Sequence, residues 1–231
     1  MIVERVVAAT PAAVGEVVAA RLTAAAAAGP QVWALTGGSA ARLVHPGLVR
    51  AGLDWARITL VFADERAVAP EHADSNYRLA RETLLEPAQV PAARVRRMRG
   101  EADDLEAAAR AYEAELPALD VVLLGLGPDG HVCSLFPGHA LLGEQVRRVA
   151  VVTDSPKAPP RRLTLTLPAL LAAREVWFVL AGADKAAAAR ALEDPASQLP
   201  GALVARGAAA ARLFMDVAAA GAAGGHDDPG R

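Results

Sequence analysis

The feature that most constrains the fold of this chain is the alternation of short apolar runs with longer helix-forming stretches. The segment 119–124, rich in valine and leucine and ending at Gly125, is the clearest of the apolar runs. Strands that alternate with helices usually pair in parallel and are covered by helices. The sequence therefore predicts an α/β fold, a three-layer α/β/α sandwich around a mainly parallel, Rossmann-like sheet.

The expected elements follow from this periodicity and from local stop signals. We expect helices over 11–28, from 39 onward, and over 76–86, 103–116 and 184–192. We expect strands over 32–35, 57–63, 95–98, 119–124, 146–152 and 176–180, while 163–167 is left open between a strand and an extended loop. Leu203 is expected to open a short strand, and 213–217 is left open between a strand and a helix end. The sequence His45-Pro46-Gly47 is expected to break or kink the second helix.

These elements are separated by no linker longer than a few residues. We therefore expect one domain over 1–220, followed by a flexible C-terminal tail over 221–231, where the composition is that of a frayed terminus. A domain of this size buries roughly 70–75% of the surface of its unfolded chain, so it needs neither disulfide nor metal to hold its core.

Charge and cysteine content exclude several classes of protein. The net charge of −2 gives no indication of binding to nucleic acid or to a membrane surface. The most apolar stretch, 14–29, is interrupted by Glu16 and Arg21, so no membrane-spanning helix is expected. A single cysteine, Cys133, excludes an internal disulfide and favours a cytoplasmic location.

Polar motifs follow the first two expected strands. Thr36-Gly37-Gly38-Ser39 lies between a strand and a helix, where backbone N–H groups at the helix start suit a phosphate, although such a motif is often only a turn. Asp64-Glu65-Arg66 follows the next strand. Arg66 can bind a phosphate or carboxylate in bidentate fashion, and Asp64 can orient a hydroxyl or a base. A solvated salt-bridge patch is the alternative for this second motif.

The most informative motif follows the strand at 119–124. A loop with three glycines over 125–130 carries Asp129 and then His131. A carboxylate beside an imidazole fixes its tautomer and supports a base that works near neutral pH. This placement favours a catalytic histidine over a structural one. Cys133 is expected to be structural, because no cation flanks it in sequence to lower the pKa of its thiol.

Two further basic motifs lie later in the chain. The proline-rich stretch 155–165 concentrates three cations in a stiff loop, which suits an anionic ligand or is a solvated connector. Lys185 lies at a helix start, where its charge opposes the helix dipole unless an anion, or Asp184, offsets it. No GxSxG elbow indicates a serine hydrolase, and no helical carboxylate–histidine motif indicates a metal site.

Taken in order, these motifs resemble the 6-phosphogluconolactonase family, within the larger group that includes glucosamine-6-phosphate deaminase. The resemblance runs from about Trp33 to Ala219. Each motif alone is weak evidence for the family, whereas seven motifs in the same order are specific evidence. The matching segments are Thr36-Gly37-Gly38-Ser39, Asp64-Glu65-Arg66, Asp74-Ser75-Asn76-Tyr77, 124–131, Ser134-Leu135-Phe136-Pro137-Gly138, 155–166 and Gly182-Ala183-Asp184-Lys185.

The resemblance implies hydrolysis of 6-phospho-D-glucono-1,5-lactone in the oxidative pentose phosphate pathway, with no metal and no cofactor. It implies that His131 is the general base, supported by Asp129. The residues implied to bind the substrate and its phosphate are Gly37, Gly38, Ser39, Asp64, Arg66, Arg162 and Lys185. The only partner expected is the sugar-phosphate lactone, and the protein is expected to be a monomer or a weak homodimer.

This chain departs from the family pattern at a few positions. Val132 and Cys133 replace the usual Thr-Ala after the histidine, and Phe214 replaces a tryptophan. The deaminase branch carries a glutamate five residues after the histidine, where this chain has Phe136. A phenyl ring supplies no proton relay, which favours hydrolysis over isomerisation with deamination. The second rival is a sugar-phosphate sensor, which would keep the phosphate-binding residues without the base.

Overall fold

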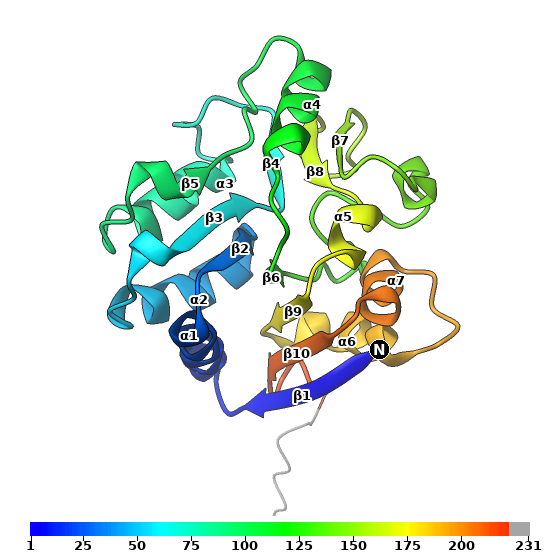
Figure 1. Cartoon of the computed structure of the whole chain (residues 1–231). Helices are drawn as coiled ribbons and strands as arrows, with labels where there is room; N and C mark the ends of the chain where they lie inside the picture. The colour runs from blue at the N-terminus through cyan, green and yellow to red at the C-terminus, as the bar shows by residue number, and fades with distance from the viewer. Residues whose placement is uncertain (222–231) are drawn as a thin grey trace, which may run out of the picture.

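The computed structural model describes residues 1–221 and is built on a parallel sheet of seven strands (Figure 1). All neighbouring strands in this sheet run parallel. In spatial order the strands are β1 (Ile2–Ala8), β10 (Ala211–Asp216), β9 (Glu175–Leu180), β6 (Val121–Leu124), β2 (Gln31–Leu35), β3 (Ile58–Phe62) and β5 (Val95–Arg96). The central strands β2, β3, β6 and β9 are almost wholly buried, as expected for strands covered on both faces.

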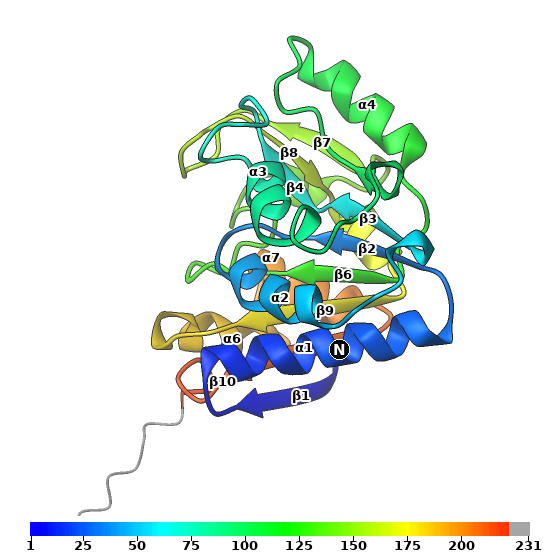
Figure 2. The same ribbon diagram turned by 90° about the vertical axis from the view of Figure 1, so that its left-hand side faces the viewer.

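Helices cover both faces of this sheet (Figure 2). One face is covered by α1 (Pro11–Ala28) and α2 (Gly38–Arg50), and the other by α5 (Leu167–Leu171), α6 (Ala186–Glu193) and α7 (Pro200–Gly207). The short α3 (Asn76–Ala80) continues into a π-helical turn over Arg81–Leu85, and both pack on α2. The predicted three-layer α/β/α fold is therefore confirmed.

A second, antiparallel sheet of three strands was not predicted. It consists of β4 (Asp64–Arg66), β8 (Arg162–Leu165) and β7 (Val149–Val152), in that spatial order, with α4 (Leu105–Glu115) packed against β7. The motif Asp64-Glu65-Arg66, which follows β3, thus forms a short strand of its own and pairs with the basic segment near 162. Single 3₁₀ turns lie at Trp55–Arg57, Ala92–Arg94, Ala140–Gly143 and Ala183–Lys185.

Several sequence-based expectations need correction. Leu203 lies within α7 rather than in a strand, because Pro200 starts a helix whose residues 200–202, 204 and 205 are buried. Of the break or kink expected at Pro46, the break is excluded, since α2 continues to Arg50. Strand β1 was missed because its alternation includes Glu4 and Arg5, yet every second side chain is half-buried as at a sheet edge.

The structure also decides the two segments left open by the sequence and shifts the start of one expected strand. The segment left open at 213–217 is strand β10, and 163–167 contributes strand β8. The strand expected from 146 starts only at Val149. The predicted C-terminal tail lies, apart from Gly221, outside the described residues, and the single-domain division stays a prediction.

Helix α1 is long and apolar enough, by length and composition, to cross a membrane, and it is the one helix within residues 1–221 that meets this test. In the fold it instead packs against α2 and the β9–β10 side of the sheet through Val14, Val18 and Leu22. Only 28% of this apolar window is buried, and much of the rest of the helix is alanine, the strongest helix former.

The crossing of α1 and α2 is close enough to require glycine. A Cβ atom added to Gly15 would lie 1.9 Å from the carbonyl oxygen of Leu43, and one added to Gly47 would lie 2.7 Å from Cβ of Ala19. We expect Gly15→Ala to lower the free energy of unfolding by about 1–3 kcal/mol through overpacking. This loss would exceed the gain of about 1 kcal/mol that alanine brings to a helix interior.

Urea denaturation would measure the effect of Gly15→Ala. The matched control is Ala20→Ser on the exposed side of the same helix, which we expect to change the free energy of unfolding by no more than about 0.5 kcal/mol. A Gly15→Ala protein as stable as wild type would show that the two helices separate at little cost.

Candidate active site

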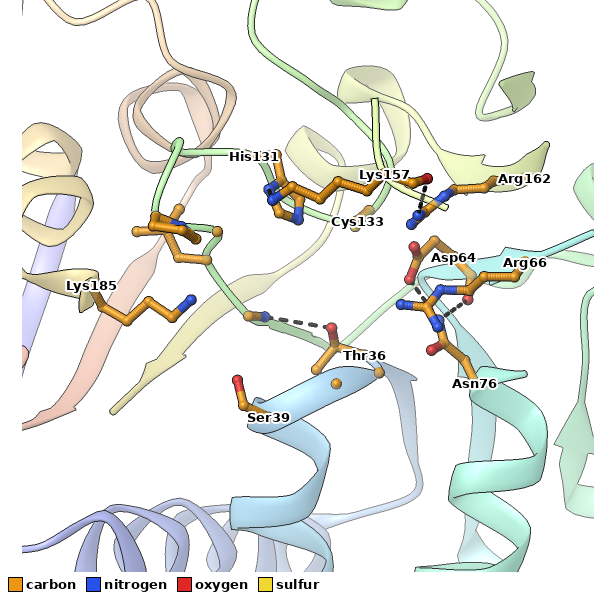
Figure 3. A pocket seen from close by; sticks show the side chains of 16 residues that line it. Thr36, Ser39, Asp64, Arg66, Asn76, His131, Cys133, Lys157, Arg162 and Lys185 are labelled. Atoms are coloured by element: carbon orange, nitrogen blue, oxygen red, sulfur yellow. Dashed lines mark hydrogen bonds between the residues drawn. The ribbon is translucent and has the colours of Figure 1, made fainter. Parts of the chain in front are cut away.

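The candidate active site lies at the carboxyl edge of the parallel sheet, where β2, β3, β6 and β9 end close together (Figure 3). The strands are in register there, with Leu35 paired to Phe62 and Leu124 to Phe178. Ligands of open parallel sheets bind at this edge. The loops enclose a pocket of about 190 Å³, lined by Thr36, Gly37, Gly38, Ser39, Asp64, Arg66, Asn76, Gly125, Leu126, Gly127, Pro128, His131, Cys133, Lys157, Arg162 and Lys185.

One end of the pocket, which we call the anion end, consists of Gly37, Gly38, Ser39 and Lys185. Helix α2 begins at Gly38, whose φ of +63° is in the left-handed region that favours glycine. The start of α2, with the positive end of its dipole, lies on the same side of the pocket as Lys185 (Figure 3). The Lys185 side chain is only 16% exposed, and its ammonium group lies 3.2 Å from Asp184. A helix start beside a cation is an arrangement that suits a phosphate.

Gly37 is required by a close approach rather than by its backbone conformation. A Cβ atom at this position would lie 1.9 Å from Oδ1 of Asn76. The amide Nδ2 of Asn76 donates hydrogen bonds of 3.0 Å to the carbonyl oxygen and to Oδ1 of Asp64. The glycine therefore lets the loop after β2 pack against the start of α3, and both Gly37 and Asn76 line the pocket.

The central feature of the pocket is the pair of His131 and Asp129. Nδ1 of His131 lies 2.5 Å from Oδ1 of Asp129. Burial opposes ionisation of Asp129, but the hydrogen bond with His131 and the charge of Lys157 outweigh it and lower its pKa to about 2. An ionised carboxylate can only accept a hydrogen bond, so Nδ1 carries the proton and donates it to Asp129. Nε2 is then left with a free lone pair.

The environment of the His131 ring favours its neutral form. Burial lowers the pKa of His131 below its ordinary value, against the opposing influence of Asp129. The ring also lies against Phe136, with 4.9 Å between ring centroids. A neutral imidazole with an unprotonated Nε2 at the pocket wall is suited to act as a general base.

A second group of cations comes from the antiparallel sheet. Pairing of β4 with β8 places Arg66 directly opposite Arg162. Burial and the nearby Arg66 guanidinium lower the pKa of Arg162. Like charges directly opposite one another destabilise a sheet, and a bound anion or polarised oxygen offsets that repulsion. Figure 3 shows these arginines on the opposite side of the pocket from Lys185.

Most of the hydrogen bonds of the Arg162 guanidinium go to backbone carbonyl groups of the loop that precedes it. Its Nε donates to the carbonyl oxygen of Pro159 at 3.0 Å, and its Nη2 donates to those of Lys157 and Ala158 at 2.8 and 3.2 Å. Three of the five N–H groups of a guanidinium are thereby used. Arg162 fixes the loop over 157–159, and its direct contact with a phosphate stays a prediction.

Asp64 and Glu65 are buried carboxylates with different partners. Asp64 accepts a hydrogen bond from Oγ of Ser134 at 2.8 Å as well as those from Asn76, which fixes its orientation in the pocket wall. Glu65 is not among the lining residues of the pocket and accepts hydrogen bonds from Oγ of Ser75 and from the backbone N–H groups of residues 66, 76 and 77. Glu65 thus ties the segment that carries Arg66 to the start of α3.

The structure brings together eight of the nine site residues expected from the sequence, and the ninth, Asp129, contacts His131. Sequence reasoning did not assign Lys157 or Asn76 to the site, and these two line the pocket together with Cys133, which was expected to be structural. Lys157 and Asn76 lay within motifs already noted, so only their orientation was missing. Burial and the charge of Asp64 raise the pKa of the Cys133 thiol, which keeps it protonated and agrees with the structural role expected for it.

No group of three or more histidine, cysteine, aspartate or glutamate side chains within residues 1–221 is arranged to hold a metal ion. The polar groups of the pocket are mostly cations, amide donors and hydroxyl groups, with one imidazole and the carboxylate of Asp64. This set is suited to a polar, anionic small molecule.

A family model described as glucosamine-6-phosphate isomerases/6-phosphogluconolactonase matches residues 6–214. The chain belongs to this family. It is 47% identical over 176 residues to 6-phosphogluconolactonase of Rattus norvegicus, a match that covers 72% of this chain and 68% of the relative. The structure of 6-phosphogluconolactonase from Trypanosoma brucei superimposes with a TM-score of 0.84 at 27% identity, covering 94% of this chain and 97% of the other.

The fold alone does not separate the two branches of the family. A monomeric glucosamine-6-phosphate deaminase also superimposes with a TM-score of 0.82, at 22% identity, over 94% of this chain and 99% of the other. The distinction therefore depends on side chains in the pocket. Phe136, at the position where the deaminase pattern has glutamate, packs on the His131 ring and offers no proton-transfer group.

Proposed function

We propose that this chain hydrolyses 6-phospho-D-glucono-1,5-lactone to 6-phospho-D-gluconate, the second step of the oxidative pentose phosphate pathway. Relatives named 6-phosphogluconolactonase support an enzyme of this type and lactone hydrolysis as its reaction. The observation that carries the proposal is the His131–Asp129 pair, which lies in a pocket with cations on two sides. No cofactor is needed for this reaction.

In the proposed mechanism, Nε2 of His131 removes a proton from a water molecule as its oxygen attacks the lactone carbonyl carbon. The negative charge that develops on the carbonyl oxygen is stabilised by backbone N–H groups of the loops or by Arg66. Collapse of the tetrahedral intermediate breaks the bond to the ring oxygen, and His131 returns its proton to that oxygen. Asp129 holds the ring and stabilises the transient imidazolium.

The anion end is proposed to bind the phosphate and so to set the position of the lactone relative to His131. Binding energy from a non-reacting group contributes to the rate when it orients the reacting atoms. A lactone without the phosphate is therefore expected to react poorly.

The direct test is hydrolysis of freshly prepared lactone, followed by acid release at neutral pH with and without the protein. Because the lactone also opens unaided, the uncatalysed rate is subtracted. Acceleration over this background supports the proposal. Its absence, together with ammonia release from an amino-sugar phosphate, would instead assign the chain to the deaminase branch, and binding without turnover would indicate a sensor.

Lys185→Met is expected to raise KM for the phosphorylated lactone by about tenfold or more, with a smaller change in kcat, because a charge-assisted contact to phosphate contributes about 1.5–3 kcal/mol. The same variant should leave the slow turnover of the non-phosphorylated lactone unchanged, which provides an internal control. Equal losses on both lactones would show that Lys185 does not contact the phosphate. Steady-state kinetics on the two substrates make this comparison.

A cytoplasmic location, a monomeric or weakly dimeric state and the absence of nucleic-acid and membrane partners remain predictions.

A further inference from the structure

Lys157 belongs to a loop whose backbone is unusually well fixed. Its N–H donates to Oγ of Ser155 at 3.2 Å, and its carbonyl oxygen accepts hydrogen bonds of 2.8 Å from Oγ of Ser155 and from Nη2 of Arg162. Prolines at 156, 159 and 160 further restrict the loop. The base of the Lys157 side chain therefore has a defined position, although the side chain itself is 42% exposed.

From this position the side chain extends toward His131 (Figure 3) and contacts Asp129. Nζ of Lys157 lies 3.2 Å from Oδ2 and 3.4 Å from Oδ1 of Asp129. It also lies 3.1 Å from Nδ1 of His131. The ammonium group and the imidazole ring thus share one carboxylate, and they approach it from different loops.

We propose that Lys157 is a positioning residue for the proposed hydrolysis, whose ammonium group neutralises Asp129 and keeps the His131 ring uncharged with Nε2 available as the base. The catalytic role of Lys157 rests on the proposed function. The contacts of Lys157 with Asp129 and His131 do not depend on which substrate is bound. Asp129 alone would orient the ring and also favour its protonation. Lys157 leaves the orientation intact and opposes the second effect, so that the resting ring is neutral while Asp129 still stabilises the transient imidazolium.

The charged groups that face His131 come from three elements. Asp129 lies in the same loop, Lys157 comes from the loop before β8, and Asp64 lies at the start of β4. Burial and the charge of Lys157 lower the pKa of His131, whereas Asp129 and Asp64 raise it. Removal of Lys157 leaves two carboxylates without the opposing cation, so the pKa of His131 should rise.

The protonation state of His131 determines how kcat/KM depends on pH. Only neutral His131 accepts a proton, so kcat/KM falls as the pH drops through the pKa of His131, and in wild type this limb should lie below about 6.5. Lys157→Met should move the limb to higher pH by about one unit, the size expected for one nearby charge. Lys157→Arg keeps the charge and should restore most of the wild-type profile.

Lys185→Met is the matched control, because it removes a different pocket cation that does not contact His131. It should raise KM and leave the acidic limb in place. An unchanged limb in Lys157→Met, or an equal shift in both variants, would overturn the inference.

A second readout separates this inference from the proposed function. The His131 ring can be titrated by NMR in the ligand-free protein, with its signal among the five histidines assigned by its loss in His131→Gln. A higher titration midpoint in Lys157→Met than in wild type supports the inference even if the lactone is not hydrolysed. Identical midpoints would overturn it even if the lactone is hydrolysed.

Discussion

His131→Ala is expected to lower kcat by about 10²- to 10⁴-fold, the range typical for loss of a general base. The ring is the one imidazole that lines the pocket, and its Nδ1 is committed to Asp129, which leaves Nε2 to accept the proton of the attacking water. KM should change much less, because the anion end is untouched. Initial rates of lactone hydrolysis, corrected for the spontaneous reaction, measure the loss.

Two controls support the interpretation of this variant. Circular dichroism should show an unchanged fold, since the His131 side chain faces the pocket and is partly exposed. Binding of the product 6-phosphogluconate, measured by calorimetry, should be retained within a few-fold. Activity of His131→Ala within a few-fold of wild type would exclude the histidine as the base.

Gly127→Ala is expected to reduce kcat by about 10²-fold without removing any functional group, because misplacing a catalytic group by about 1 Å has an effect of this size. A Cβ atom at this position would lie 1.9 Å from Nδ1 of His131 and 2.3 Å from Oδ1 of Asp129. The φ angle of Gly127 lies outside the left-handed region, so alanine fits the backbone conformation. The added Cβ atom therefore clashes with the side chains of His131 and Asp129. Either the ring or the carboxylate must move.

The matched control is Gly143→Ala in an exposed 3₁₀ turn, where an added Cβ meets no atom within 4 Å. We expect this variant to keep wild-type kcat and stability. Thermal unfolding of both variants tells whether Gly127→Ala acts on the site or on the whole fold. Full activity in Gly127→Ala would mean that the loop relaxes without disturbing His131.

Much of the site was predictable because local sequence determines it. Strand-like runs followed by glycine and polar residues indicated which loops would carry function. The spacing of Asp129 and His131, two apart across Gly130, allowed a hydrogen bond, and Gly130 has the positive φ of +81° that the turn requires. The elements least well predicted were short or edge segments, such as β1 and β4, whose mixed polar patterns give a weak local signal.

The sequence by itself determined the α/β class and the edge of the sheet where the site lies, since the carboxyl ends of parallel strands share one edge. Only the tertiary structure decided that Arg66 lies opposite Arg162, and that Lys157 reaches the His131–Asp129 pair. The physical reason is that periodicity fixes the type and direction of an element within a few residues. Pairing between distant segments depends instead on the packing of complementary surfaces and on loop closure, which no local pattern encodes.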